Sequence, residues 1–401
     1  MDRRYHHRNM MPRFPILVSG IVFASRFESA AAWSSSSLGV RSGVARRTLV
    51  APERRRSFEG EKNRAGASRL SESGAEAFND GFGEDADQKT SLALLIWKFS
   101  RPHTLIGSAV AIPTLHCLAA PHLNSVFTLK ALSSIGVSII PALLINIYVT
   151  GLNQITDVDI DKINKPNLPI PAGLLSVADA KLIVSACLFF GLLAGALVGT
   201  TGLNLALWGS VVLGTLYSMP PFRLKRFPLL AAACIVAVRG TIINVGFFAH
   251  AQQFAFGNPM GIVQTLLTDK KCILSSLFYG IFGIVIALMK DVPDVAGDAR
   301  ANIRSFSVKV GQKTIFNSAR RLLSFLLYGF GIGFLTRIAS APSLSITACR
   351  ALVGSTSIIA GFRVFQRSVG VDPEDSGQVY NYYMYLWKIF YLSYIALPFV
   401  K

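Results

Sequence analysis

Charged residues are scarce in this sequence, and their scarcity excludes an ordinary soluble protein. Of the 401 residues, 15% are charged and 51% are hydrophobic, and the mean hydropathy is +0.45. Soluble domains carry about 25% charged residues and bury their apolar residues in shorter runs. The net charge of +18 does not indicate nucleic-acid binding, because the Lys and Arg residues lie mainly in an N-terminal leader and in loops between apolar runs, as in membrane proteins.

Paired cysteines and clustered histidines are also missing. None of the five cysteines belongs to a Cys-x-x-Cys pair, and each lies in or at the edge of an apolar run. We therefore interpret them as small buried hydrophobic residues rather than as metal ligands or disulfides. The six histidines lack the spacing of metal ligands as well.

The first 88 residues differ from the rest of the chain. Residues 1–70 contain fourteen Lys and Arg against five acidic residues, and residues 71–87 contain six acidic residues and no basic one. Since no apolar periodicity runs through them, we predict a disordered N-terminal targeting leader over 1–88. Its Arg-rich, Ser-rich composition is typical of an organelle transit peptide. The apolar run Phe14–Ala24 resembles a signal-peptide core, so a bipartite plastid address and a plain transit peptide both stay open.

Residues 89–401 contain nine apolar runs long enough to cross a hydrocarbon core of about 30 Å. In lipid such runs must be helical, because the backbone finds no water with which to form hydrogen bonds. The sequence therefore predicts an all-α membrane protein with nine transmembrane helices in one domain, 89–401. The predicted spans are 104–120, 131–151, 178–200, 202–219, 229–250, 272–289, 322–339, 343–362 and 381–400.

The basic residues of this domain favour one orientation in the membrane. If there are nine spans, the segments that follow the second, fourth, sixth and eighth spans share a face with the N-terminus. Most Lys and Arg residues lie there, whereas the opposite loops hold Lys130, Lys270, Lys271 and Arg337. The positive-inside rule then places the basic face in the cytosol or stroma.

Acidic residues are the scarcest class in the membrane domain, and most of them form two groups. From residue 88 onward there are eleven Asp or Glu residues, and six belong to the segments Asn153–Asp161 and Lys290–Asp298. Each group begins where an apolar span ends, after the second and the sixth span, so both lie on the basic face. Scattered solvation would not concentrate acids in this way.

Helical spacing separates the acids of the first segment. If the second span continues as a helix past the membrane edge, Asn153, Asp157 and Asp161 share one face because they are four residues apart, whereas Asp159 lies off that face.

The second segment has a similar pattern. Asp291, Asp294 and Asp298 are spaced i, i+3, i+7, and a bend at Pro293 would leave them on one face. Carboxylates so close together repel one another and need a counter-ion. Mg²⁺ binds through a few carboxylates and shares its remaining positions with substrate phosphates. The pattern therefore predicts a diphosphate held through Mg²⁺, with its lipid tail in the bilayer. Two solvated helix ends neutralised by neighbouring Lys and Arg are the alternative interpretation.

Basic residues near these acids fit an anionic substrate. Lys165, Arg223 and Lys225 lie on the same predicted face, where each is either a ligand or a determinant of topology. Arg239 differs, because it lies inside the fifth span, where a charge is costly and is by default functional. A structural ion pair is the alternative interpretation of Arg239.

The motifs of the chain resemble those of UbiA-type intramembrane prenyltransferases. Residues Asn153–Pro169 resemble the first signature of that family, and Lys290–Asp298 resemble the second. Tyr217–Arg226 resemble the loop between them, and Arg101–Thr104 resemble the entry to the first helix. The resemblance implies nine helices around a central cavity and the transfer of a prenyl group from its diphosphate to an aromatic acceptor.

Within that family the chain is most similar to the plastid homogentisate prenyltransferases. Residues Ser305–Gln312 favour the phytyl branch, which leads to tocopherol, whereas Tyr217–Arg226 and Val238–Gly240 favour the solanesyl branch, which leads to plastoquinone. We favour phytyl transfer with decarboxylation in a plastid membrane. Solanesyl transfer and a UbiA-type enzyme with another aromatic acceptor are alternatives, and a cation-coupled transporter is a hypothesis from another class.

The resemblance also implies roles for individual residues. Four aspartates would hold Mg²⁺ and act in catalysis: Asp157, Asp161, Asp294 and Asp298. Eight further residues would bind substrate, with Arg101 and Arg239 as candidates for an anionic group of either substrate. These eight are Arg101, Asn153, Lys165, Tyr217, Arg223, Lys225, Arg239 and Asp291.

Overall fold

The structure, a computed structural model, describes residues 91–258 and 260–400. These residues form helices joined by turns, and no β-strand occurs among them. The all-α fold predicted from the sequence is therefore confirmed over this range. The predicted targeting leader, residues 1–88, lies outside the described residues and stays a prediction.

Every apolar run predicted to cross the membrane coincides with a long helical segment. Five segments of the described chain are long and apolar enough to cross a membrane by length and composition, so the number of nine crossings stays a prediction. The described helices are α1 (Leu92–Phe99), α2 (Pro102–Ala119), α3 (Leu129–Thr156), α4 (Val158–Asn164), α5 (Val177–Val198), α6 (Thr201–Ser218), α7 (Pro228–Val236), α8 (Ile243–His250), α9 (Ile262–Thr268), α10 (Lys270–Lys290), α11 (Val295–Arg300), α12 (Phe306–Val310), α13 (Gln312–Leu335), α14 (Leu344–Ser368) and α15 (Ser376–Ala396).

Short polar residues begin several of the long helices. The side chains of Thr128, Ser176 and Thr200 each accept a hydrogen bond from a backbone N–H in the first turn of α3, α5 and α6. Such caps satisfy donors that have no partner within the helix. Pro102 and Pro228 occupy the first position of α2 and α7, where a missing N–H costs nothing. The sequence thus sets these helix starts locally.

The fifth predicted span is a continuous helical segment with two irregular stretches. It runs from Pro228 to Ala255 and contains the π-helical stretches η5 (Ala237–Ile242) and η6 (Ala251–Ala255). Within η5, a Cβ atom on Gly240 would lie 2.7 Å from the Cα atom of Gly280 in α10. The two helices therefore touch backbone to backbone at this point.

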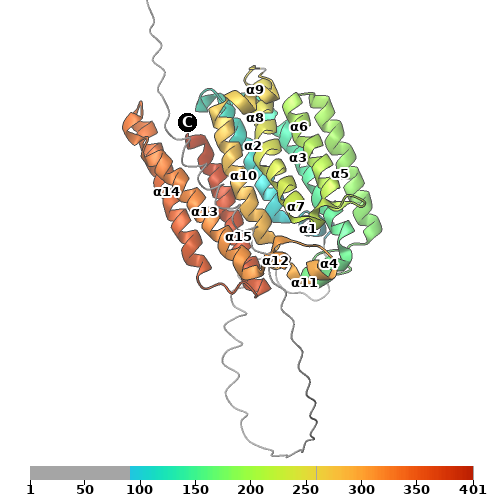
Figure 1. Cartoon of the computed structure of the whole chain (residues 1–401). Helices are drawn as coiled ribbons and strands as arrows, with labels where there is room; N and C mark the ends of the chain where they lie inside the picture. Colours follow the sequence, from blue (N-terminus) through green and yellow to red (C-terminus); the bar gives the residue numbers. More distant parts are fainter. Residues whose placement is uncertain (1–90, 259, 401) are drawn as a thin grey trace, which may run out of the picture. The chain divides into compact units, whose positions relative to one another are not determined.

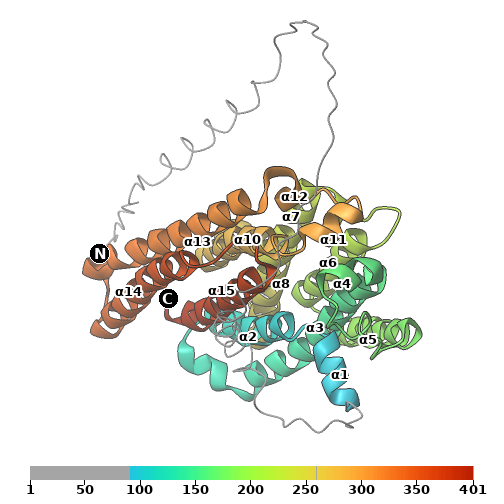
Figure 2. The same cartoon turned by 90° about the horizontal axis from the view of Figure 1, so that it is seen from below.

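The long helices pack into one bundle (Figures 1 and 2). Helices α13 and α14 pair on one side of it, and α5 packs against α3 on the other, with α10 between α13, α15 and the η5 stretch. In the most apolar stretch of α10, 67% of the residues are buried, compared with 17% in α14. Helix α10 is therefore a core helix, whereas α14 presents an apolar outer surface suited to lipid.

The two aspartate segments lie together at one end of the bundle. Helix α4 follows α3 and α11 follows α10, and α4 and α11 pack against each other at that end (Figure 1). The side chain of Asn164 joins them, because its amide donates to the carbonyl of Asp294 at 2.9 Å and accepts from the N–H of Gly297 at 2.8 Å. Gly297 is required there, since a Cβ atom would lie 2.6 Å from the Asn164 amide.

Candidate active site

The first aspartate segment is a broken helix rather than the continuous helix predicted. Helix α3 ends at Thr156, Asp157 adopts a non-helical conformation with φ −116°, and α4 begins at Val158. The four-residue spacing survives the break, because the N–H of Asp161 still donates to the carbonyl of Asp157 at 2.8 Å. Asn153 also donates to the Asp157 carboxylate at 2.9 Å. The continuous helix that would give these three residues a shared face is therefore interrupted, but Asn153, Asp157 and Asp161 still line one pocket.

Asp159 is separate from this group, as its spacing predicts. Its side chain is 95% exposed and pairs with Lys162 at 3.1 Å. It therefore belongs to the solvated surface of α4.

The second aspartate segment is also interrupted. Helix α10 ends at Lys290, Asp291 and Asp294 are the cap residues on either side of the gap, and α11 begins at Val295. Pro293 lies in the gap, so the chain breaks at the proline instead of bending there. The continuous i, i+3, i+7 helix face predicted from the sequence is wrong, but the fold still directs Asp291, Asp294 and Asp298 into one pocket.

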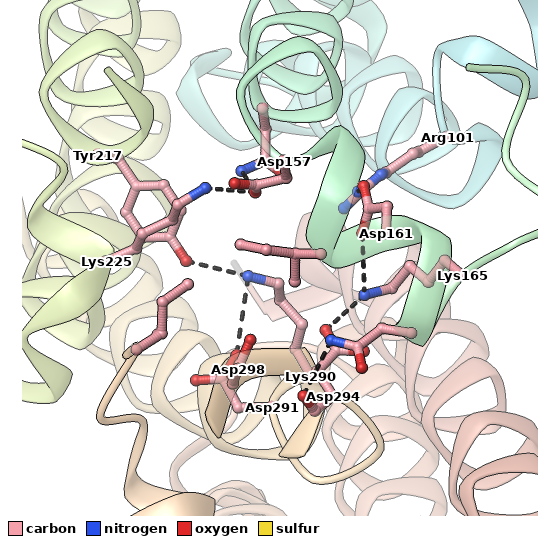
Figure 3. Close-up of a pocket in the computed structure, with 14 residues that line it drawn as sticks. Arg101, Asp157, Asp161, Lys165, Tyr217, Lys225, Lys290, Asp291, Asp294 and Asp298 are labelled. Carbon is pink, nitrogen blue, oxygen red and sulfur yellow. Dashed lines mark hydrogen bonds and ion pairs between the residues drawn. The ribbon is translucent and has the colours of Figure 1, made fainter. Parts of the chain in front are cut away.

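Both segments line that pocket, at the end of the bundle where α4 and α11 meet. In Figure 3, Asp157 and Asp161 lie on one side of the pocket, and Asp291, Asp294 and Asp298 lie on the opposite side. Lys290 extends between the two groups. The lining residues are Arg101, Asn153, Asp157, Ile160, Asp161, Asn164, Lys165, Tyr217, Lys225, Lys290, Asp291, Asp294, Asp298 and Ile303.

Basic side chains compensate most of the aspartates. Asp157 is bound by Lys225 and by Arg223, whose guanidinium lies 3.0 Å from one carboxylate oxygen. Lys165 reaches across the pocket, because it pairs with Asp294 in α11 and lies 3.9 Å from Asp161 in α4. The acid groups are therefore stabilised by protein cations as well as by any metal, so repulsion among the acids does not by itself require one.

Two further cations complete the lining. Arg101 lies 3.7 Å from Asp161. Lys290 lies 3.8 Å from Asp291 and donates a hydrogen bond of 3.0 Å to the hydroxyl of Tyr217. These contacts bring cations from four separate parts of the chain to one place.

The backbone is strained where two of the arginines enter the site. Arg101 has φ +52° and Arg223 has φ +39°, both in the left-handed region that side-chain-bearing residues rarely adopt. Such a conformation costs on the order of 1–3 kcal/mol and persists when surrounding contacts enforce it. Each arginine here contacts a pocket aspartate, so the strain is stored at the site.

Burial and neighbouring charge set the ionisation of the first carboxylates. Burial alone would raise the pKa of Asp157, but Lys225 and Arg223 outweigh it and hold that pKa below its usual value. Burial lowers the pKa of Lys225 to about 8, with Asp157 opposing this effect. The pair is therefore ionised at neutral pH. At Asp161, burial raises the pKa more than Arg101 and Lys165 lower it.

The second group is less compensated. Burial raises the pKa of Asp298 to about 7, and the negative charges of Asp291 and Asp294 act in the same direction. No basic group lies within 4 Å of the Asp298 carboxylate in the described part of the chain. A cation that entered the pocket would relieve this accumulation of negative charge.

The donor set of the pocket fits a hard divalent cation shared with a ligand. Among the described residues, no three Asp, Glu, His or Cys side chains stand close enough to hold a metal by themselves. Mg²⁺ commonly uses one or two carboxylates and completes its shell with water and phosphate oxygens. One oxygen of Asp161 is buried without a hydrogen-bond partner, and Asp298 lines the same pocket with no basic group within 4 Å among the described residues. These two carboxylates therefore suit a metal that shares its shell with phosphate.

Most of the predicted site residues come together in this pocket. Ten of the twelve line it, and Arg223 reaches it through Asp157. Arg239 does not line it and lies farther inside the bundle, with its guanidinium over the ring of Trp387. The sequence analysis missed Asn164 and Lys290, although both lie within the two motifs and next to residues that it selected.

A profile of the UbiA prenyltransferase family matches residues 110–389 of this chain. The chain belongs to the UbiA prenyltransferase family. Among its relatives, homogentisate phytyltransferase 1 of Arabidopsis thaliana is 38% identical and the match covers 76% of this chain and 75% of that protein. Homogentisate geranylgeranyltransferase of Hordeum vulgare is 36% identical, covering 76% and 72%. Homogentisate solanesyltransferase of Arabidopsis thaliana is 35% identical, covering 76% of each.

A solved structure shows the same fold. A UbiA homologue from Archaeoglobus fulgidus bound to GPP and Mg²⁺ superposes with a TM-score of 0.50 at 16% identity, covering 76% of this chain and 99% of that one. In the present chain, the pocket carboxylates gather at one end of the bundle. That arrangement does not favour the transporter hypothesis, which needs ionisable groups along a path through the membrane.

Proposed function

We propose that the chain is a Mg²⁺-dependent homogentisate prenyltransferase of a plastid membrane that transfers a phytyl group with decarboxylation. Relatives that carry the names homogentisate phytyl-, geranylgeranyl- and solanesyltransferase support the acceptor, since three such proteins are 35–38% identical to this chain. Chloroplastic names among them and the apolar helices support the membrane and the organelle. Nine crossings and a cleaved targeting leader over 1–88 belong to the same proposal.

The observation that carries the proposal is the convergence of both aspartate motifs with four basic side chains on one pocket. Arg101, Lys165, Lys225 and Lys290 all line it, at the end of an otherwise apolar bundle. A prenyl diphosphate has the matching form, with a polyanionic head and an apolar tail. Its head would enter the pocket while its tail stayed among the helices or in lipid.

Metal and lysine ligands would share the work of activating the leaving group. Asp157, Asp161, Asp294 and Asp298 would hold Mg²⁺, which supplies Lewis-acid stabilisation of the departing diphosphate. Lys165 and Lys225 are now bound to aspartates. Because both ammonium groups line the pocket or contact its aspartates, they would also bind diphosphate oxygens there.

The remaining pocket residues would position these groups. Asn153 holds the carboxylate of Asp157, and Tyr217 holds the ammonium of Lys290 beside Asp291. Loss of diphosphate breaks the allylic C–O bond and leaves a cation, which a water-poor, aromatic-rich interior stabilises. The electron-rich ring of homogentisate then forms the new C–C bond, and the alkylated ring carbon loses its proton. The carboxyl group leaves as carbon dioxide, and the methylene carbon that carried it takes up a proton to become a methyl group.

The donor is the least constrained part of the proposal. A second phytyltransferase relative, a probable one from Oryza sativa, is 39% identical, against 35% for the solanesyltransferase. Residues Ser305–Gln312 favour phytyl, whereas Tyr217–Arg226 favour solanesyl. Phytyl diphosphate is therefore the proposed donor, with solanesyl diphosphate as the alternative.

A donor-by-acceptor assay tests the proposal. Purified protein in liposomes is given phytyl, geranylgeranyl or solanesyl diphosphate together with homogentisate, dihydroxynaphthoate or chlorophyllide, with Mg²⁺ or with a chelator. We expect homogentisate to be the only one of the three acceptors that is prenylated, and kcat/KM to be highest with phytyl diphosphate. With chelator we expect no product until Mg²⁺ is restored. Prenylation of another acceptor in place of homogentisate would refute the acceptor, and full activity with chelator would refute the metal.

A further inference from the structure

Arg239 carries a charge in the interior of the bundle, away from the diphosphate pocket. It lies in the η5 stretch of the segment Pro228–Ala255, which is one of the candidate membrane spans. A cation at such a depth is costly and is retained where it has a function. Its stem packs next to Gly283 of α10, where a Cβ atom would lie 3.6 Å from the Cβ of Arg239.

No carboxylate compensates this charge. Among residues 91–258 and 260–400, none lies within 4 Å of the Arg239 guanidinium, although Arg101 and Arg223 each have one. Its contacts are aromatic instead: the guanidinium carbon lies 4.7 Å from the ring centre of Trp387 and 5.7 Å from that of Phe390. Cation–π contacts of this kind only partly replace the solvation that the cation has lost.

The side chain of Arg239 is not fully buried. Part of its surface is accessible, whereas Trp387, over which the guanidinium lies, is 1% exposed. Arg239 therefore keeps surface that a ligand can contact.

Aromatic residues connect Arg239 to the diphosphate pocket. The ring of His103 lies 5.2 Å from Trp387 and 6.1 Å from Tyr383, and His103 is two residues from Arg101 of the pocket. Tyr383 lies within electrostatic range of Arg239, and also of Lys290 and Arg101. Ring contacts therefore run from His103, next in space to Trp387, to the guanidinium of Arg239.

The local backbone is built to hold Arg239 in this place. The chain forms a π-helical stretch over Ala237–Ile242, and such stretches are rare and concentrate at functional sites. Asn244 donates side-chain hydrogen bonds to the carbonyls of Arg239 and Gly240. The hydroxyl of Tyr394 in turn donates to the amide oxygen of Asn244 at 3.3 Å.

Charge balance then identifies the ligand of Arg239. Ionisation of an allylic diphosphate creates a cation, and the uncompensated positive charge of the Arg239 guanidinium would oppose its formation. The diphosphate already has four basic residues in its own pocket. The other substrate of the proposed reaction is an aromatic acid, whose carboxylate would neutralise a guanidinium while its ring lies against aromatic side chains.

We propose that Arg239 and His103, with Trp387 packed behind the guanidinium, form the subsite that binds the carboxylate and ring of the aromatic acid acceptor. This inference rests on the proposed function and adds the acceptor site to it. It has two consequences. Acceptor binding removes the positive charge that opposes ionisation, so prenyl diphosphate is activated when the acceptor is present. The prenylated product has lost its carboxylate as carbon dioxide and therefore no longer binds Arg239.

Binding and inhibition measurements on purified protein in liposomes test the subsite. The variants are Arg239→Gln and Arg239→Lys. Arg320→Gln is the matched control, because Arg320 is also a helix arginine stacked on a ring, 5.0 Å from Phe365, and bonds Ser368 rather than the pocket. The ligands are ¹⁴C-homogentisate, phenylacetate as a simple acid, and 2-methylhydroquinone as the neutral ring without the carboxylate.

We expect Arg239→Gln to weaken homogentisate and phenylacetate binding by roughly 30-fold or more, since a buried charge partner is lost. In Arg239→Gln, binding of 2-methylhydroquinone and the KM for prenyl diphosphate should stay within about threefold of wild type. Arg239→Lys should recover part of the acid binding. Arg320→Gln should behave as wild type. Equal loss for acid and neutral ligands, or unchanged homogentisate binding, would overturn the inference. Wild-type protein that does not prenylate homogentisate would instead refute the proposed function.

Discussion

The diphosphate pocket and the Arg239 subsite balance their charges in opposite ways. In the pocket, the protein supplies both signs, so Asp157 is paired with Lys225 and Asp294 with Lys165 before any ligand is present. At Arg239 the described residues supply a positive charge and aromatic rings, but no carboxylate within 4 Å. A ligand for the pocket must exchange existing pairs and therefore needs to bring both a cation and an anion, as a metal diphosphate does. A ligand for Arg239 has to bring a single anion.

The strongest test of this contrast removes one pocket carboxylate. Asp294→Asn keeps the size of the side chain but removes a proposed metal ligand and the partner of Lys165. We expect kcat to fall by about 10³-fold, because stabilisation of the leaving diphosphate is lost. Turnover at saturating Mg²⁺ is the measurement, and equilibrium binding of ¹⁴C-homogentisate is the control, which should not change. A variant with wild-type turnover would contradict the role of this motif.

Removal of one pocket cation should have a smaller effect. Lys225 is 7% exposed and binds Asp157, so Lys225→Met leaves a packed side chain without its charge. We expect kcat/KM for prenyl diphosphate to fall by roughly 10- to 100-fold, with homogentisate binding unchanged. Lys162→Met is the matched control, because Lys162 is 59% exposed and pairs with the exposed Asp159. Equal losses in the two variants would show that the effect is one of general surface charge.

A backbone change tests whether the Arg239 region depends on close packing. A methyl group on Gly240 would meet the backbone of Gly280, so Gly240→Ala should separate the η5 stretch from α10. We expect a loss of about 1–3 kcal/mol in the free energy of unfolding, together with weaker homogentisate binding. Thermal unfolding in detergent measures the first effect. Gly329→Ala in α13 is the control, since its Cβ atom would meet nothing within 4 Å, and similar destabilisation there would refute the packing argument.

The smallest expected effect is that of the acid outside the pocket. Asp159→Asn removes the charge of a side chain that is 95% exposed, although it lies only two residues along the chain from Asp157 and Asp161. Exposed ion pairs contribute about 0–1 kcal/mol, so turnover and Mg²⁺ dependence should stay within about twofold of wild type. A loss comparable to that of Asp294→Asn would mean that any charge in the motif matters, regardless of its position.

The sequence by itself determined the class of the protein and most of the residues that line the pocket. Long apolar runs can satisfy their backbone in lipid only as helices, and a concentration of acids at the ends of two apolar runs, in a chain with so few acids, indicates a functional site. These constraints act locally. They identified the helical segments, both aspartate motifs and the separation of Asp159 from Asp157 and Asp161.

The tertiary structure decided what depends on distant parts of the chain. The second motif breaks at a proline that the sequence shows, whereas the first breaks at Asp157, where no proline stands, and contacts between α4 and α11, such as those of Asn164, hold the two segments together. The partners of the charges are equally non-local, since Lys225 meets Asp157 across 68 residues of sequence. Spacing reveals which residues share a helix face, whereas packing alone decides which charges meet a partner and leaves Arg239 to face rings.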